Sequence, residues 1–297
     1  YPRVAMDDML DATLDVTFYG VRGSTPCPSD ANARYGGNTS CVVVDVPGGD
    51  PILLDLGTGL RFYGVDEPCD QAPFRGTALV SHLHWDHIQG LPFFTPINCP
   101  DARLDVYGPR NGRTLEACFE EFMAPPYFPI GFRDLAGDVG FHDVGAGSFD
   151  VGPATVTVAA VPHVGATNGY RIDWNGLNIA YVSDHQEPVG APRLVDEAVL
   201  ALVDGVDLLI HDAQFTPDEF AQRPDWGHCT VDYAVEVAHQ AGVGELVLFH
   251  HDPAHCDATV DGLLEGAQAT AVGRNVGAVS AAAEGRTISL GSSRPAA

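Results

Sequence analysis

Four side chains that can bind a metal ion lie within six residues, directly after an apolar segment that predicts a β-strand. The segment is TALVS at 77–81, and the four are His82, His84, Asp86 and His87. In an extended chain, residues two apart face the same way, so His82 and His84 can converge on one point. If the chain then enters a helix, Asp86 and His87 project toward a neighbouring point. Imidazole and carboxylate together suit a pair of metal ions. A histidine-rich surface loop is the alternative, and the clustering of four such groups disfavours it.

Further polar residues follow other apolar segments of the chain. His163 ends VTVAAVPH, Asp184 ends IAYVSD, the pair His211-Asp212 ends DLLIHD, and the pair His250-His251 ends LVLFHH. Open α/β sheets bind ligands at the ends of their strands, so these residues predict one shared site. Each of them alone could equally be a buried polar residue of the core. His228 stands just before a predicted helix, where contact with the helix start is the alternative to a catalytic role.

The remaining pattern predicts an α/β protein with a single domain. We expect strands at 15–21, 39–46, 52–55, 77–81, 103–107, 155–161, 169–173, 177–182, 207–210 and 245–249. We expect helices at 86–94, 113–122, 192–202, 231–240 and 260–271. Buried strands flanked by helices indicate a layered α/β domain. The expected boundaries are an N-terminal extension at 1–14, the domain at 15–290 and a C-terminal tail at 291–297.

Two loops have alternative interpretations. The stretch 123–137 is rich in proline and aromatic residues, so it either covers a pocket as a lid or packs on the core as an apolar loop. The loop 34–39, RYGGNT, either presents backbone N–H groups to an anion or makes a tight turn between strands.

Composition bears on partners and on cellular compartment. The chain has 15 basic residues, all of them arginine, against 40 acidic ones, which gives a net charge of −25. Such a surface repels polyanions, so binding to long nucleic acid is not expected. The seven cysteines show no C-x-x-C pair, which disfavours a disulfide framework and fits a reducing compartment. With no apolar run long enough to span a membrane and no secretory leader, we expect a cytoplasmic protein.

The order of these motifs resembles the metallo-β-lactamase superfamily, from about residue 15 to the last predicted helix. The H-x-H-x-D-H signature is present at His82 to His87, and His163, Asp184 and His250 follow in the family's order. The resemblance implies a four-layer αβ/βα sandwich with two zinc ions at one edge. One zinc would be held by His82, His84 and His163, the other by Asp86, His87 and His250, with Asp184 bridging them. His250 is preferred to His251 because it directly follows the strand. Sites of histidine and aspartate also suit Mn²⁺ or Fe²⁺.

Within the superfamily, three stretches resemble the branch that contains ribonuclease Z and cyclic phosphodiesterases. These are Tyr107-Gly108-Pro109, His211-Asp212-Ala213 and Gly227-His228-Cys229-Thr230. The chain departs from the usual pattern at His185, where that branch has Thr, and at Cys229, where it has Ser. It also lacks the long basic arm with which ribonuclease Z grips tRNA.

We therefore expect a dinuclear zinc phosphodiesterase that uses a hydroxide generated at the metals. Its expected substrate is a small nucleotide, cyclic or linear, or another phosphodiester. His228 is expected to be the general acid, oriented by Asp212, with Asp86 serving as both ligand and catalytic residue. The alternatives are a lactonase or β-lactamase, tRNA 3′ processing, and a metal-holding module without activity. A small phosphodiester is the expected partner, no membrane is expected, and a homodimer is left open.

Overall fold

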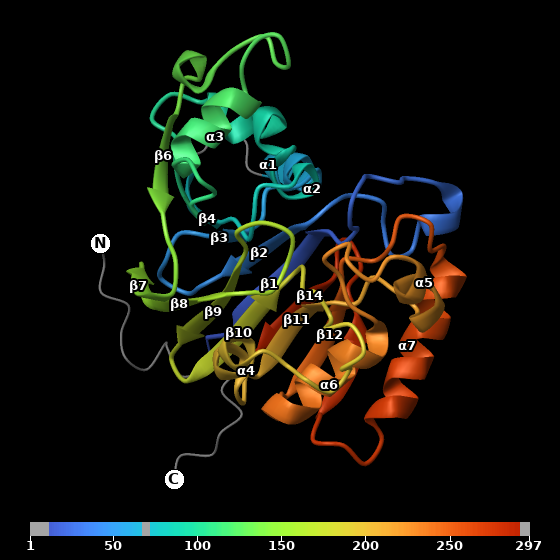
Figure 1. Cartoon of the computed structure of the whole chain (residues 1–297). Helices are drawn as coiled ribbons and strands as arrows, with labels where there is room; N and C mark the ends of the chain where they lie inside the picture. The colour runs from blue at the N-terminus through green and yellow to red at the C-terminus, as the bar shows by residue number, and fades with distance from the viewer. Residues whose placement is uncertain (1–11, 67–71, 292–297) are drawn as a thin grey trace.

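The computed structural model describes residues 12–66 and 72–291, and there the chain forms two seven-stranded β-sheets (Figure 1). The first sheet has the order β14-β1-β2-β3-β4-β5-β6. Its strands are β1 (Leu14–Gly20), β2 (Cys41–Asp45), β3 (Ile52–Leu54), β4 (Arg75–Leu79), β5 (Arg103–Gly108), β6 (Asp138–Asp143) and β14 (Thr287–Leu290). The second sheet has the order β13-β12-β11-β10-β9-β8-β7. Its strands are β7 (Gly147–Val151), β8 (Ala154–Ala160), β9 (Asn168–Trp174), β10 (Leu177–Val182), β11 (Leu208–Asp212), β12 (Glu245–Phe249) and β13 (Ala278–Ala281).

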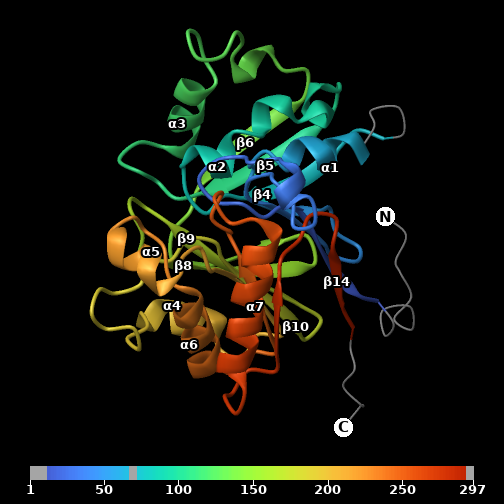
Figure 2. The same cartoon turned by 90° about the vertical axis from the view of Figure 1, so that its right-hand side faces the viewer.

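Helices cover the outer face of each sheet (Figure 2). The helices are α1 (Leu60–Asp66), α2 (Trp85–Ile88), α3 (Leu115–Phe122), α4 (Glu197–Val203), α5 (Pro217–Gln222), α6 (Val231–Ala241) and α7 (Asp257–Ala271). The elements α1, α2 and α3 lie on the first sheet, whereas α4, α6 and α7 lie on the second (Figure 1).

Three apolar layers hold the molecule together. The middle layer joins the two sheets, and there Val16 and Phe18 of β1 share a core with Tyr170 of β9. The outer layers bury one face of each sheet under its helices. Strand β1 alternates between fully and partly buried residues, whereas β2 buries Val42 and Val44 toward the other sheet and Val43 toward the helices. The expected four-layer αβ/βα sandwich is confirmed.

The strand directions place several carboxyl ends at one edge of the second sheet. Strands β10, β11 and β12 are parallel neighbours, and β8 runs in the same direction because it is antiparallel to β9, as β10 is. The segments that follow these strands therefore leave the sheet side by side. In the first sheet β3, β4, β5 and β6 are also parallel.

The ten strands expected from the sequence are all present, with ends shifted by at most two residues. Four further strands were not expected, namely β6, β7, β13 and β14. The short helices α1 and α5 were not expected either. The prediction of a single helix at 86–94 is wrong. It divides into α2 and a 3₁₀ turn at Leu91–Phe93, because Gly90 packs against the Gly57 carbonyl and Pro92 has no N–H to donate.

Three expectations on composition and domain limits can be compared with the described residues. Cys99 is disulfide-bonded, while Cys27, Cys41, Cys118, Cys229 and Cys256 carry free thiols, so the argument for a reducing compartment is weaker than expected. In the described part of the chain, no helix combines the length and the apolar character needed to cross a bilayer. Most of the expected extension and tail lies outside the described residues, although Leu14 already belongs to β1.

Candidate metal centre

Seven side chains from both sheets converge at one edge of the sandwich. His82 and His84 lie in the segment after β4, and Asp86 and His87 lie on α2. From the second sheet, His163 follows β8, Asp184 follows β10 and His250 follows β12. The structure therefore brings together all seven residues that the sequence predicted as ligands.

The first group consists of His82, His84 and His163, each of which offers one ring nitrogen to a shared point. His84 Nδ1 and His163 Nε2 are 3.3 Å apart. His163 Nδ1 donates a hydrogen bond to the Gly227 carbonyl at 2.7 Å, which leaves Nε2 to face the group. Gly227 has a φ of 95°, and a Cβ there would stand 2.3 Å from the His163 ring. Only glycine meets both requirements without displacing that ring.

The second group consists of Asp86, His87 and His250. His250 Nε2 lies 3.1 Å from Asp86 Oδ2 and 3.2 Å from His87 Nε2. His250 Nδ1 donates to Gln214 Oε1 at 2.9 Å, so its Nε2 points into the group. The backbone N–H of Ser24 donates to Asp86 Oδ2 at 2.7 Å and holds that carboxylate in place.

The carboxylate of Asp184 lies between the two groups and turns one oxygen toward each. Its Oδ1 is 3.2 Å from His87 Nε2 and 3.5 Å from His250 Nε2. Its Oδ2 is 3.7 Å from His163 Nε2 and 3.8 Å from His82 Nε2. This arrangement fits a carboxylate that contacts two cations at once.

The donor set fits divalent cations on three counts. His82 Nε2 and Asp184 Oδ1 are buried and lack a hydrogen-bond partner, which is costly unless another group satisfies them. Ligands about 2.0–2.1 Å from a tetrahedral metal are roughly 3.3 Å apart, close to the 3.1–3.3 Å that separate neighbouring donor atoms here. Both groups combine imidazole with the nearby carboxylates, as zinc, manganese and iron sites do.

The electrostatics of the cluster agree with that fit. Burial lowers the pKa of His82 well below its ordinary value, which favours the neutral imidazole that can bind a metal. Burial would also lower the pKa of His87, but the carboxylates of Asp86, Asp184 and Asp55 outweigh it and raise this pKa well above its ordinary value. Burial alone would raise the pKa of Asp184, yet His250 and His87 hold it well below its usual range. A cation bound here would compete with a proton for Nε2 of His87.

Asp55 supports this cluster, and the sequence analysis did not single it out. Its Oδ2 accepts hydrogen bonds from His87 Nδ1 and Tyr181 Oη, both at 2.7 Å, and from Ser81 Oγ at 2.8 Å. Its Oδ1 accepts from the Ser81 N–H at 2.6 Å. The signal that could have found it is that ILLD ends a buried strand with an aspartate, as IAYVSD does. Gln214, which holds His250, had no comparable signal.

His228 and Asp212 lie beside the two groups. His228 Nδ1 donates to Asp212 Oδ2 at 3.1 Å and lies 3.6 Å from Asp184 Oδ2. Burial would lower the pKa of His228, but Asp212 and then Asp184 raise it above its ordinary value. The ligand-forming atoms of His228, Asp184 and His250 also lie close enough to share a cation.

Three other histidines lie near the centre but form contacts outside the two groups of ligands. His185 Nδ1 contacts His211 Nε2 at 3.0 Å, and His211 Nδ1 donates to the Asp212 carbonyl. His251 Nε2 donates to the Ala282 carbonyl at 3.0 Å. His250 has a φ of 60°, so the change in direction after β12, rather than strand alternation, separates the two adjacent rings.

The comparisons with known proteins agree with this geometry. Residues 52–251 match the family model described as the beta-lactamase superfamily domain. The chain belongs to this superfamily. It is a metal-dependent hydrolase, as the resemblance implied.

Its relatives lie in the expected branch of the superfamily. The chain is 25% identical over 287 residues to the ribonuclease Z of Methanothermobacter thermautotrophicus, covering 80% of this chain and 86% of that protein. Identity to the ribonuclease Z of Haloarcula marismortui is 24% over 289 residues, with the same two coverages. Among solved structures, the metallo-beta-lactamase fold protein YhfI from Bacillus subtilis has a TM-score of 0.70 at 21% identity, covering 94% of this chain and 99% of that one. A diphosphatase from the PhnP family has a TM-score of 0.67 at 19% identity, covering 94% and 98%.

The two loops with alternative interpretations can now be compared with the structure. In the loop 34–39, the N–H groups of Arg34 and Tyr35 donate to Asp257, that of Gly36 to the Asn32 carbonyl, and that of Asn38 to Glu284. These donors are not free for an anion, so the structure supports the turn.

The stretch 123–137 divides between two surroundings. Phe132 packs on Phe119 of α3 and Phe141 of β6, as an apolar loop would. Tyr127 and Phe128 instead line a cleft next to α2.

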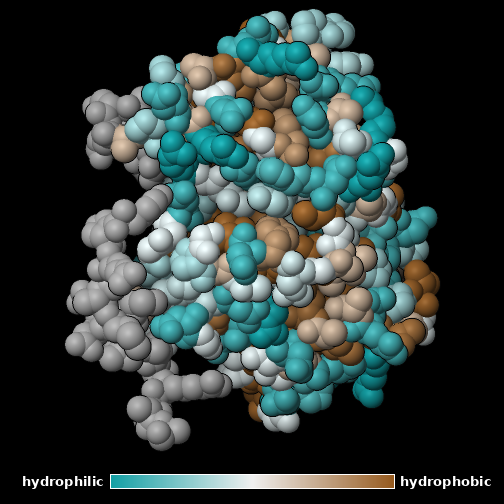
Figure 3. Space-filling view, turned by 90° about the vertical axis from the view of Figure 1, so that its left-hand side faces the viewer, coloured by the Kyte–Doolittle hydropathy of each residue, from teal (hydrophilic) through white to brown (hydrophobic). Residues whose placement is uncertain are grey.

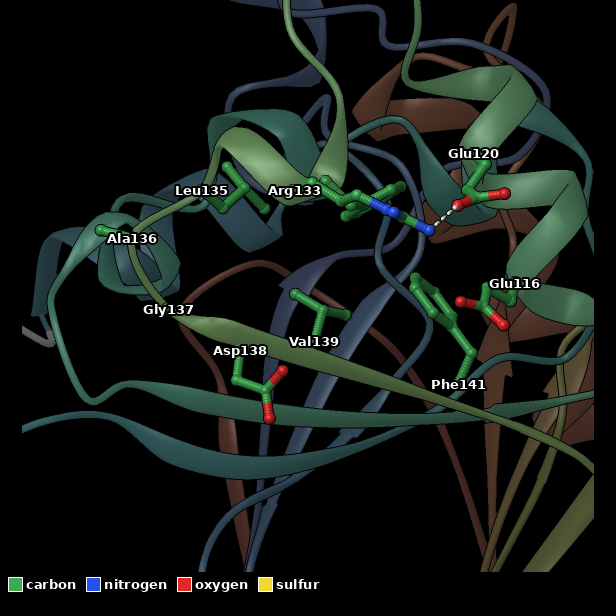
Figure 4. Close-up of a pocket in the computed structure, with 10 residues that line it drawn as sticks. Glu116, Glu120, Arg133, Leu135, Ala136, Gly137, Asp138, Val139 and Phe141 are labelled. Atoms are coloured by element: carbon green, nitrogen blue, oxygen red, sulfur yellow. Dashed lines mark ion pairs between the residues drawn. The ribbon is translucent and has the colours of Figure 1, made fainter.

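A separate pocket of about 390 Å³ lies between α3 and β6, where Arg133 faces Glu120 (Figure 4). No candidate metal ligand lines that pocket. The face bearing β6 and β7 is a mosaic of hydrophilic and hydrophobic residues (Figure 3).

Proposed function

We propose that this hydrolase cleaves a small phosphodiester and that the seven converging residues hold two divalent cations, zinc in the first instance. The observation that carries the proposal is Asp184, whose two oxygens face two separate groups of ligands. When bound, two such cations supply a water of lowered pKa and neutralise charge on the phosphoryl oxygens. The formal charge of the cluster supports an anionic substrate, because two cations bring +4 and Asp86 and Asp184 remove only two.

The side chains around the cations orient the ligands. Asp55, Gln214 and the Gly227 carbonyl each accept the second N–H of one histidine and thereby fix which nitrogen faces the cation. Ring orientation is therefore set before any metal binds.

His228 is the residue that we assign to protonation of the leaving oxygen. Asp212 accepts the Nδ1–H, which leaves Nε2 as the nitrogen that can hand over a proton. Asp212 is itself fixed, because its Oδ2 also accepts from the His185 N–H and its Oδ1 from the Gln214 N–H. A carboxylate held in this way can orient the imidazole and stabilise its charged form.

A small substrate is favoured over a long nucleic acid by charge. The net charge of −25 and the lack of lysine disfavour binding of polyanions, because proteins bind them mainly through lysine and arginine. The second candidate is tRNA 3′ processing, which the names of the curated relatives favour.

The test combines a substrate panel with the His228→Ala variant. The panel contains bis(p-nitrophenyl) phosphate, cyclic AMP, a lactone, a cephalosporin and a precursor tRNA, each with zinc-loaded protein. Turnover of the first two supports the proposal, turnover of the tRNA supports the second candidate, and turnover of the lactone or cephalosporin alone contradicts both.

His228→Ala separates the assigned roles through the leaving group. We expect kcat for cyclic AMP, whose leaving alkoxide needs a proton, to fall about 10²–10⁴-fold. The loss for bis(p-nitrophenyl) phosphate should be much smaller, because p-nitrophenolate leaves without a proton. The metal content should stay at that of the wild type, and a His239→Ala variant at the far end of α6 serves as the control. Equal losses on both substrates would remove the general-acid role, and loss of metal would make His228 a ligand.

A further inference from the structure

An apolar cleft of about 720 Å³ lies beside the candidate metal centre. One wall comes from α2 and the following turn, with Trp85 and Phe93, and the other from the end of α3 and the loop after it, with Phe122, Tyr127 and Phe128. Its volume is in the range of pockets that bind small molecules.

The cleft and the candidate metal centre share a stretch of chain. Leu83 and Trp85 line the cleft, and they are sequence neighbours of the ligands His82, His84 and Asp86. Asn111 also lines the cleft and lies near a second part of the centre. Its Nδ2 is 3.9 Å from the position that a Cβ on Gly165 would take, and Gly165 is two residues from the ligand His163. The cleft therefore adjoins the segment that carries three of the candidate ligands, although none of the seven ligands lines it.

Several of the aromatic rings remain exposed to solvent. The exposed fraction is 75% for Trp85, 59% for Phe93 and 81% for Tyr127. Phe93 meets Phe128 edge to face, with ring centroids 5.9 Å apart. Exposed large apolar groups gathered around a hollow mark a binding surface more often than a structural one.

The chemistry of the lining selects the kind of group that fits. Aromatic side chains stack on the faces of nucleobases, whatever the base. The amides of Gln89 and Asn111 add donors and acceptors for the edge of a heterocycle. None of the residues that line the cleft is basic, and its one carboxylate, Glu121, is paired with Arg113. The cleft therefore suits an uncharged planar ring and offers no positive charge to a phosphate backbone.

We propose that this cleft binds the base of a nucleotide whose phosphodiester lies at the metal centre. The inference rests on the proposed function and adds to it the class of substrate and the residues that recognise it. Tyr127 and Phe93 are the stacking residues, since both are exposed and belong to different segments that line the cleft.

The test measures binding rather than turnover, so it can fail or succeed independently of the phosphodiesterase proposal. The metal-loaded protein is titrated calorimetrically with AMP and with ribose 5-phosphate, which carry the same phosphate and differ by the base. We expect AMP to bind about 5- to 150-fold more tightly, which corresponds to one stacked base at about 1–3 kcal/mol. In Tyr127→Ala and in the Phe93→Ala/Tyr127→Ala double variant, this ratio should fall toward one while binding of ribose 5-phosphate stays unchanged.

Controls make the outcome specific. Phe62, which is 48% exposed on α1, does not line the cleft, so Phe62→Ala should keep the ratio of the wild type. Equal binding of AMP and ribose 5-phosphate by the wild type would overturn the proposal, as would a ratio that survives in the double variant. Octyl phosphate gaining as much affinity as AMP would also overturn it, because the cleft would then be a general apolar site. If the ratio behaves as expected but no phosphodiester is turned over, the base site stands and the proposed reaction falls.

Discussion

Replacing Asp55 by asparagine should weaken both the fold and the binding of metal, although Asp55 belongs to neither group of ligands. The carboxylate is fully buried and accepts four hydrogen bonds, three at Oδ2 and one at Oδ1. Asparagine has nearly the same shape but only one accepting oxygen. In its better orientation that oxygen keeps the three donors, and the new NH₂ group faces the Ser81 N–H, so two donors oppose each other.

The size of the effect follows from these contacts. A buried donor left without an acceptor costs about 1–3 kcal/mol, and hydrogen bonds to a charged group lose roughly 1 kcal/mol each when the charge is removed. Relief of the desolvated charge offsets part of this loss. We therefore expect the free energy of unfolding of the metal-free protein to fall by about 2–4 kcal/mol. Because His87 loses a charged partner, the affinity for a divalent cation should fall about 10- to 100-fold.

The two effects are measured separately. Urea unfolding in the presence of a chelator gives the stability of the metal-free chain, and competition with a chromophoric chelator gives the affinity for zinc. Tyr181→Phe is the matched control, because it removes one donor to the same carboxylate and leaves three. It should cost about 1 kcal/mol and leave the zinc affinity within a few-fold of the wild type. If Asp55→Asn bound zinc as tightly as Tyr181→Phe, Asp55 would not orient His87 and the reasoning would be refuted.

Two further pairs of substitutions test the geometry of the cluster. His250→Ala should remove about one of two bound zinc ions per chain. His251→Ala should retain both, since His251 donates to the Ala282 carbonyl instead. Elemental analysis that shows the reverse would exchange the two assignments. Gly227→Ala should weaken zinc binding because the new Cβ meets the His163 ring. Gly176 has a φ of 81° and open space around it, so Gly176→Ala should lower the stability by about 1–2 kcal/mol and leave the zinc affinity unchanged. Equal zinc affinities in these two glycine variants would show that His163 does not depend on Gly227.

The sequence was most informative where strands are buried on both sides. All ten expected strands lie inside the two sheets, and each of the four that were missed forms an edge. An edge strand has a neighbour on one side only, so its side chains need not be strongly apolar. Strand β6, for instance, has no fully buried residue, and its sequence DVGFHD shows no clear alternation. Hydrophobic periodicity therefore predicted the interior of each sheet and not its limits.

The candidate site shows a similar division. Ligand residues could be proposed from spacing and position, since His82 and His84 are two residues apart and Asp184 and His250 follow strands. The pairing of each ligand with the residue that holds it could not be proposed, because Asp55 lies 32 positions from His87 and Gln214 lies 36 from His250. Each pair joins segments that follow neighbouring parallel strands, β3 and β4 for the first pair and β11 and β12 for the second. No local sequence pattern records which strands are neighbours.

The distribution of candidate ligands over the two sheets has a consequence for biosynthesis. His82 to His87 leave the ribosome early, but neither group of donors is complete until later residues have been translated. The first needs His163 and the second needs His250, so a nascent chain that ends between them could hold one cation at most. If the proposed pair of cations is bound, loading with the second must follow, rather than guide, the docking of the two halves. Any cellular supplier of that metal would then meet an almost finished chain.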